Sequence, residues 1–306
     1  MLVFVTCSIF HQTFRVQTFS RVQILQQFSS RCQELAANDN RGFKQEFEEL
    51  NDIGKDLPSR REEQIPLHIT LRPLPGEALG PELPPTLRLH QCKFCARWRI
   101  GERLHLHPGA SSGHVADFWR MVWEQNVRVI VMVTALRHKD AVLCEKYWPP
   151  EGATVCYGLI QVTTMRCKKG PDYFITSINL RQRDSPTSRT ITQYYYPSWP
   201  DRGVPREPSS LCAFSEHVRQ DLEGSPRLGP AVVHCSAGVG RSGTFVTLLW
   251  LMQLCVRGIR PNVRAAVEDL RLHRMWMVQN LDQYIFVHQC LLHWLVWRTA
   301  AGWENQ

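Results

Sequence analysis

The chain has 306 residues, of which 43% are hydrophobic and 21% charged, a composition typical of a globular protein that can bury a large core. The formal net charge is +8, but the 36 basic residues are spread along the chain without a long lysine or arginine run, so no nucleic-acid partner is expected. The 11 cysteines have no framework spacing and follow no signal peptide, which excludes a disulfide-rich secreted protein and predicts a reducing, cytoplasmic setting. The apolar start is too short for a membrane span.

The first predicted helix covers residues 41–50, where Phe43, Phe47 and Leu50 share one face and acidic residues lie opposite. The character changes over residues 62–113, which hold seven of the 19 prolines and no lasting apolar periodicity. We expect loop or disorder there.

Regular structure is expected again from residue 117, with a helix that places Phe118, Met121 and Val122 at helical spacing. Buried or alternating apolar patterns predict strands over 127–135, 153–165, 172–182, 189–196 and 229–233. Two later helices are predicted over 263–273 and 282–297. Mixed strands followed by helices indicate an α/β (α+β) domain, in which a twisted mixed sheet is flanked by helices.

The most informative run is His-Cys-Ser-Ala-Gly-Val-Gly-Arg-Ser-Gly-Thr at residues 234–244, between a predicted strand and an apolar helix. In such a loop the backbone N–H groups and the positive end of the helix dipole bind an anion, and Arg241 adds a planar clamp for phosphate oxygens. The same field lowers the pKa of Cys235, which suits a nucleophile, and Ser242 is placed to donate to its sulfur. The alternative, a buried structural cysteine beside a tight turn, does not account for the full run.

Two further stretches complete the chemistry. Asp201 lies in Trp-Pro-Asp-Arg-Gly-Val-Pro, a loop that can close over a site and supply an acid for the leaving oxygen and then a base for water. Gln279 and Gln283 carry amides that can hold that water. Taken alone, Asp201 reads as a turn residue and the two glutamines as helix-cap or surface residues.

Together these motifs resemble the protein tyrosine phosphatases, whose signature matches 234–243, whose WPD loop matches 199–205 and whose Q loop matches 279–283. The similarity covers roughly 30–61 and 115–297, and it is most like receptor-type members with one catalytic domain. Dual-specificity and lipid phosphatases share the cysteine and arginine spacing, but the WPD and Q loops argue against them.

The resemblance implies the tyrosine-phosphatase fold and a role for each matched residue. Cys235 is the nucleophile, Asp201 the general acid and base, Arg241 the phosphate clamp, Ser242 the thiolate partner and Gln279 the water-positioning residue. His234 tunes the cysteine. The substrate-binding set is Ser236, Ala237, Gly238, Val239, Gly240, Arg241, Asp201, Gln279 and Gln283. No metal or cofactor is implied, and the expected partners are phosphotyrosine-containing proteins.

The chain departs from the family over 62–113, where the family's Asn-Arg-Tyr recognition segment and its Asp-Tyr-Ile-Asn-Ala stretch belong; the first tyrosine here is Tyr147. The resemblance stops and resumes abruptly, which indicates a segment translated out of frame or from an alternative exon and predicts an incomplete fold. Outside it, His138 stands where the family usually has a glutamate that orients the arginine. Arg202 replaces the usual histidine after Asp201, and its charge is expected to lower the pKa of that aspartate.

These observations leave two functions open, a phosphotyrosine hydrolase and a catalytically impaired, pseudophosphatase-like or truncated isoform without the recognition loop. The predicted layout is an extension at 1–29, a phosphatase domain at 30–298 and a tail at 299–306. Derivation from a receptor-type parent would make the chain membrane-associated. A zinc site has four candidate ligands whose spacing fits no common finger, and it is not favoured: Cys92, Cys95, His105 and His107.

Overall fold

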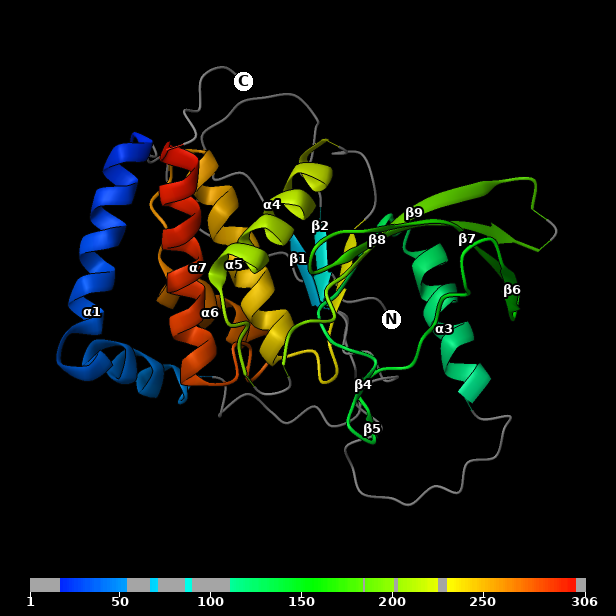
Figure 1. Ribbon diagram of the computed structural model, residues 1–306, viewed down its shortest axis with the longest axis horizontal. Coiled ribbons are helices and arrows are strands. Elements are labelled where there is room, and N and C mark those ends of the chain that lie inside the picture. The colour runs from blue at the N-terminus through cyan, green and yellow to red at the C-terminus, as the bar shows by residue number, and fades with distance from the viewer. Residues whose placement is uncertain are drawn as a thin grey trace.

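The structure is a computed structural model that describes residues 17–53, 67–70, 86–89, 111–183, 185–200, 203–224 and 230–300. Its centre is an eight-stranded mixed sheet with the order β1-β2-β10-β3-β9-β8-β7-β6 (Figure 1). The sheet strands are β1 Leu67–Thr70, β2 Thr86–Leu89, β3 Val129–Met132, β6 Thr154–Tyr157, β7 Ile160–Lys169, β8 Phe174–Gln182, β9 Ser188–Tyr195 and β10 Ala231–His234. A separate hairpin pairs β4 (Arg137–His138) with β5 (Ala141–Val142).

The middle of the sheet is parallel and its edges are antiparallel. Strand β10 pairs in parallel with β2 on one side and β3 on the other, and β3 pairs in parallel with β9. The four residues of β3 and of β10 are all buried, as expected for parallel strands with both faces covered. The twisted mixed sheet expected from the sequence is confirmed.

Helices cover the two faces of the sheet unequally (Figure 1). They are α1 Arg21–Leu50, α3 Ser111–Glu124, α4 Pro208–Gly224, α5 Gly240–Val256, α6 Val263–His273 and α7 Leu281–Ala300. The core on one face joins Val131 and Val233 to buried side chains of α1 and α4–α7. On the other face, Ile130 and Val232 pack with side chains of α3. Alternate residues of the same strands therefore contribute to two cores. Side chains of α5, the first helix after β10, belong to the larger core.

Helix α1 is longer than the sequence predicts and consists of two limbs. It begins at Arg21, behind a capping box between Ser20 and Gln23, and its backbone leaves helical geometry over 37–40. Asn and Asp occupy the three positions with positive φ, the residues that tolerate this conformation best. The expected boundary between 29 and 30 falls inside the first limb, where Ile24 and Phe28 are buried in the larger core.

The expectation of loop or disorder over 62–113 is wrong in two places. Strand β2 forms backbone pairs with β10 through residues 87–89, and β1 continues the sheet beyond it in antiparallel register. Each strand has only four residues, too few for a periodic pattern, and their pairing partners are distant in sequence. Strands β1 and β2 therefore extend the sheet beside β10, although the sequence predicts an incomplete fold there.

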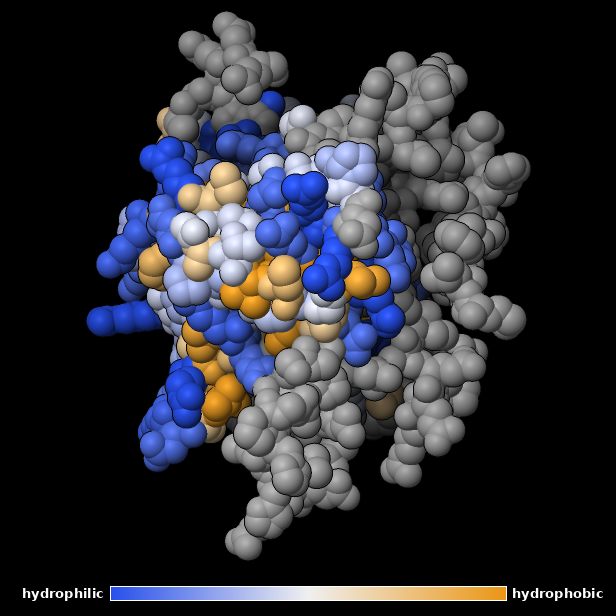
Figure 2. All heavy atoms as spheres, turned by 90° about the vertical axis from the view of Figure 1, so that its right-hand side faces the viewer, coloured by the Kyte–Doolittle hydropathy of each residue, from blue (hydrophilic) through white to orange (hydrophobic). Residues whose placement is uncertain are grey.

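Strand β6 forms the opposite edge of the sheet, and four strands lie between it and β10. The face that carries β6, β7 and α3 mixes hydrophobic and hydrophilic side chains (Figure 2). Val155 on β6, Leu159 in the turn after it and Met165 on β7 are exposed apolar residues. Among the residues that the structure describes, no helix is both long and apolar enough to cross a membrane.

Candidate active site

The loop between β10 and α5 lies at the carboxyl end of a buried strand that has parallel neighbours on both sides. In sheets of this kind, ligands bind at that end. The loop runs from Cys235 to Val239, and α5 begins at Gly240, so the N–H groups of its first turn face the loop. This is the geometry of an anion site at a helix N-terminus, supported here by the residues around it.

Cys235 lies at the base of this loop and is 2% exposed. The backbone N–H of Gly238 donates to its sulfur over 3.1 Å. Burial alone would raise the pKa of Cys235, but the positive charge of Arg241 and hydrogen bonds from the Ser242 hydroxyl and from backbone N–H groups lower it below its usual range. The buried Ser242 hydroxyl has no other partner among the described residues. The loop therefore stabilises a thiolate inside the protein.

The Arg241 guanidinium is buried and held from two sides. Its Nη2 donates to Ser236 Oγ over 2.7 Å, and its Nη1 lies 3.5 Å from the carbonyl oxygen of Trp199. A guanidinium fixed in this way presents a planar fork to an oxyanion. His138, which stands where the family usually has a glutamate that orients this arginine, is exposed on β4.

A buried hydrogen-bond chain supports His234 behind the cysteine. Gln193 donates to the Tyr147 hydroxyl over 2.9 Å, and that hydroxyl lies 2.9 Å from Nε2 of His234. Trp119 donates to the Tyr147 carbonyl over 2.8 Å. The strand end that carries the cysteine is thus fixed by side chains from α3, β9 and the connection that follows β5.

The segment 276–283 lies against the catalytic loop from the other side. Val278 donates its N–H to the Val239 carbonyl over 3.2 Å. A Cβ at Gly240 would lie 3.0 Å from Nε2 of Gln283 and 3.2 Å from Oε1 of Gln279, so both amides stand directly over the first residue of α5. Gln283 is buried and accepts from the Gln279 N–H over 2.9 Å, whereas Gln279 itself is exposed.

Asp201 and Arg202 lie outside the described residues, but the residues on both sides are placed. Trp199 is buried, and its indole N–H donates to the Gly203 carbonyl over 3.0 Å. The carbonyl of Trp199 is the one that Arg241 approaches. The residues on both sides of Asp201 are therefore joined to each other, and Trp199 lies beside the Arg241 guanidinium.

The family model for protein-tyrosine phosphatase matches residues 107–293, which is more than half of the chain. The chain belongs to the protein-tyrosine phosphatase family.

Receptor-type relatives extend the match to most of the chain. Receptor-type tyrosine-protein phosphatase V of Rattus norvegicus is 36% identical over 274 residues, covering 84% of this chain and 16% of that protein. Receptor-type tyrosine-protein phosphatase eta of Gallus gallus is 32% identical over 285 residues, covering 89% of this chain and 20% of that protein. Receptor-type tyrosine-protein phosphatase F of Danio rerio is 40% identical over 178 residues, covering 58% of this chain and 9% of that protein. The chain thus spans a fifth or less of the length of these relatives.

Within this phosphatase site, the structure adds residues that the motifs did not reveal. Arg274 donates to the Ala237 carbonyl over 3.1 Å, and although burial lowers its pKa, the negative charge of Cys235 raises it in turn. Arg274 is therefore a second cation within electrostatic reach of Cys235. Tyr147, Gln193 and Arg274 are 88, 42 and 39 positions from Cys235 by their numbers, so no local spacing pointed to them.

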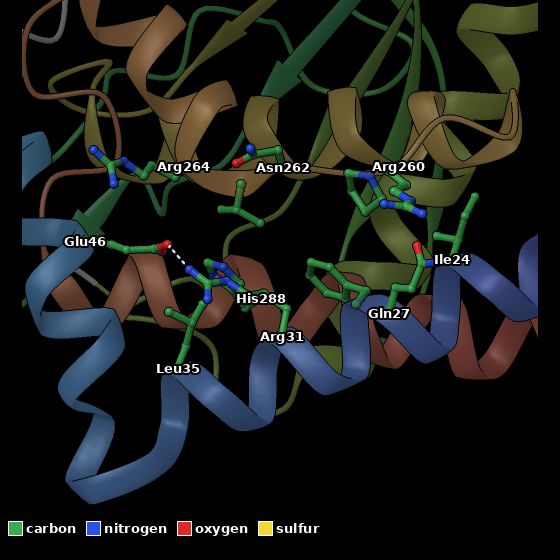
Figure 3. A pocket seen from close by; sticks show the side chains of 12 residues that line it. Ile24, Gln27, Arg31, Leu35, Glu46, Arg260, Asn262, Arg264 and His288 are labelled. Carbon is green, nitrogen blue, oxygen red and sulfur yellow. Dashed lines mark hydrogen bonds and ion pairs between the residues drawn. The ribbon is translucent and has the colours of Figure 1, made fainter. Parts of the chain in front are cut away.

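A cavity of about 650 Å³ lies apart from the catalytic loop, between α1, α7 and the start of α6 (Figure 3). Its lining includes Arg31, Glu46, Arg264 and His288 but no residue of the loop 235–239. Within the described ranges, no group of three or more His, Cys, Asp or Glu side chains could hold a metal ion. The candidate zinc ligands at 92, 95, 105 and 107 lie outside those ranges.

Proposed function

We propose that this chain is a protein-tyrosine phosphatase that hydrolyses phosphotyrosine in proteins through a cysteinyl-phosphate intermediate. One observation carries the proposal: Cys235 is buried within an N–H-lined loop, with its pKa lowered by the charge of Arg241 and by the hydrogen bonds around the sulfur. A buried thiol without such neighbours has the opposite property, as Cys255 shows, because burial raises its pKa to about 12.

In the first step, the Cys235 thiolate attacks phosphorus, forms an S–P bond and displaces the tyrosine oxygen. The equatorial phosphoryl oxygens are bound by the N–H groups of the loop and by the Arg241 fork, which stabilise charge where it develops. Asp201 protonates the departing phenolate oxygen, so tyrosine leaves as the neutral phenol. The fixed flanks at Trp199 and Gly203 support this role for Asp201.

In the second step, a water molecule attacks phosphorus and the S–P bond breaks, which releases inorganic phosphate and regenerates the thiolate. Asp201, now ionised, accepts a proton from the water. The Gln279 and Gln283 amides over Gly240 support a water-positioning role, because they stand beside the loop that holds the phosphoryl group. Ser242 stabilises the sulfur as it becomes the leaving group.

The test is a rapid-quench assay with a ³²P-labelled aryl phosphate. We expect a covalent phosphoprotein with its label on Cys235, trapped by denaturation in alkali, and a loss of turnover on the order of 10⁴-fold or more in Cys235→Ser. Asp201→Ala is expected to slow release of phenols with a high pKa more than release of nitrophenol. Cys156→Ser, at an exposed thiol, is the matched control. Turnover that survives in Cys235→Ser would refute the proposal.

A second candidate is favoured by one observation, the absence of any tyrosine before Tyr147. Without an aromatic residue to stack on the substrate ring, the chain would bind phosphotyrosine poorly, or bind it without turnover, as an impaired relative. Phosphotyrosine and phosphoserine peptides of one sequence distinguish the two candidates. A strong preference for phosphotyrosine supports the enzyme, and binding without Cys235-dependent turnover supports the impaired relative.

A further inference from the structure

Arg271, on α6, joins two parts of the chain that are far apart in sequence. It is 1% exposed, and its Nη1 donates to the Leu50 carbonyl over 2.6 Å and to Asn51 Oδ1 over 3.1 Å at the end of α1. Its Nε donates to the Met277 carbonyl over 3.0 Å and its Nη2 to the Val278 carbonyl over 2.8 Å. The planar guanidinium suits this task, because its donors point in fixed directions within one plane.

The turn that Arg271 holds is strained. Trp276 and Val278 have φ values of 66° and 59°, in the left-handed region. For a β-branched residue such as Val278 this conformation is an outlier, and it persists only where the surroundings impose it. Two of the four Arg271 contacts are to carbonyl groups of this turn, so Arg271 is part of what imposes it.

The same turn contacts the catalytic loop directly. Val278 donates to Val239, and a Cβ at Gly243 would lie 2.5 Å from the Val278 nitrogen. Gln279 follows at once, with its amide over Gly240. A shift of the turn therefore moves Gln279 relative to the loop.

The end of α1, which Arg271 also contacts, is itself held in place by hydrogen bonds and ion pairs. Glu46, on the second limb of α1, accepts from the Tyr284 hydroxyl over 2.7 Å and from Arg31 over 2.8 Å (Figure 3). One turn later, Glu49 forms an ion pair with Arg264 over 2.7 Å. These contacts fix the last turn of α1 to α6 and α7, so the oxygens at Leu50 and Asn51 give Arg271 a defined position.

We propose that Arg271 is a positioning residue for the hydrolytic step: anchored at the end of α1, it holds the 276–278 turn so that Gln279 stays over the catalytic loop. This inference rests on the proposed function, because it needs a second step in which Gln279 orients water. It predicts a kinetic signature that a purely structural arginine does not have. Slower hydrolysis of the phosphoenzyme lowers kcat and KM together and leaves kcat/KM, which reports the first step, nearly unchanged.

The test is Arg271→Lys, which keeps the charge but not the planar fork, assayed by rapid quench with nitrophenyl phosphate. We expect kcat to fall roughly tenfold while kcat/KM falls less than about threefold, with a larger burst of nitrophenol and more trapped phosphoenzyme. Asn51→Ala removes one of the four contacts, so a smaller shift in the same direction is expected. If Arg271→Lys does not fold, Asn51→Ala carries the test.

The matched control is Arg219→Lys, because Arg219 is also a buried helical arginine, 4% exposed and paired with Glu216 over 2.9 Å, but lies on α4. It should lower Tm without the split between kcat and kcat/KM. Equal losses of kcat and kcat/KM in Arg271→Lys and Asn51→Ala, or the same split in Arg219→Lys, would overturn the inference. Absence of a Cys235-dependent burst in the unmodified chain would instead refute the proposed function.

Discussion

The catalytic loop and the atypical segment at 62–113 differ in what surrounds them. The loop and Arg241 are contacted by groups from several distant elements, namely the side chains of Arg274 and Gln283 and the backbone carbonyl of Trp199. From the atypical segment, the structure describes β1, β2 and the first residues of α3, and the backbone of β2 pairs with β10.

The chemistry of the site and the stability of the sheet are therefore carried by different parts of the chain. The described contacts that set the charge and position of Cys235, Arg241 and Gln279 come from residues outside 62–113. The part of the segment that the structure describes extends the sheet beside β10. We therefore expect substitutions at the loop to act on chemistry, and substitutions in the segment to act on stability.

After Cys235→Ser, the largest effect is expected for Arg241→Lys. An ammonium group has no planar fork, so it cannot hold two phosphate oxygens and keep the contacts to Ser236 and Trp199 together. We expect kcat/KM to fall by roughly 10²- to 10³-fold with little change in Tm, measured with an aryl phosphate. Arg120→Lys, at an exposed arginine on α3, should stay close to the unmodified chain. A loss below tenfold in Arg241→Lys would show that the loop does not depend on this contact set.

The second effect is a pH dependence that follows from the lowered pKa of Cys235. Its rate of alkylation by iodoacetate should reach half its maximum below pH 9.0, the ordinary midpoint, and fall about tenfold per pH unit beneath the lowered pKa. Cys32 is the internal control, because burial raises its pKa to about 11. Equal labelling of the two thiols at pH 7, measured by mass spectrometry, would contradict the proposed thiolate.

The same shift has a defined sign for stability. Because the folded chain lowers the pKa of Cys235, its thiolate contributes fully above the unfolded value near 9.0, and this contribution is lost as the pH falls through the lowered pKa. The Tm of the unmodified chain relative to Cys235→Ser should therefore rise with pH up to about 9. A difference that is constant between pH 5 and 9 would be inconsistent with it.

The sequence predicted elements where a local pattern was strong. Helix α6 occurs over Val263–His273 as expected, behind an Asn262 cap that accepts from the Ala265 N–H over 3.0 Å. The first limb of α1 escaped notice, although its buried residues recur at intervals of four and three, because polar residues surround them: Ile24, Phe28, Cys32 and Leu35. Strands β1 and β2 had no usable signal, since each is defined by a partner strand that lies elsewhere in the chain.

The residues of the candidate site also fall into two groups, those that the sequence predicted and those that it missed. Cys235, Arg241 and Ser242 were predicted because one strand-loop-helix segment carries them, and such a segment reveals itself in consecutive residues. Arg271 and Arg274 were missed, because a lone arginine on a helix reads as a solvated residue until its partners are known. The partner of Arg271 at Leu50 is brought close by the packing of α1 against α6, and the partner of Arg274 at Ala237 lies in the loop between β10 and α5.

A smaller effect is expected for Gly243→Ala. Its Cβ would lie 2.5 Å from the Val278 nitrogen, and a backbone atom cannot move aside as a flexible side chain can. We expect a loss of about 1–3 kcal/mol in the free energy of unfolding, measured in urea, with a several-fold fall in kcat as the turn moves Gln279. Gly224→Ala is the control, because nothing lies within 4 Å of a Cβ there. Unchanged stability would show that the turn does not press on α5 as closely as the geometry indicates.

The smallest effect on chemistry is expected for Arg88→Pro, which tests the atypical segment. Residue 88 is paired on both sides, with His68 of β1 and Val232 of β10, and proline removes the N–H that a central strand needs. We expect Tm to fall by several degrees, while kcat per folded molecule changes less than about twofold, because the described contacts around Cys235 and Arg241 do not involve β2. Leu67→Pro is the control, since proline is tolerated at the first residue of an edge strand. If Arg88→Pro lowered kcat per folded molecule more than tenfold, β2 would be shaping the loop through β10, and chemistry and stability would not be separable in this domain.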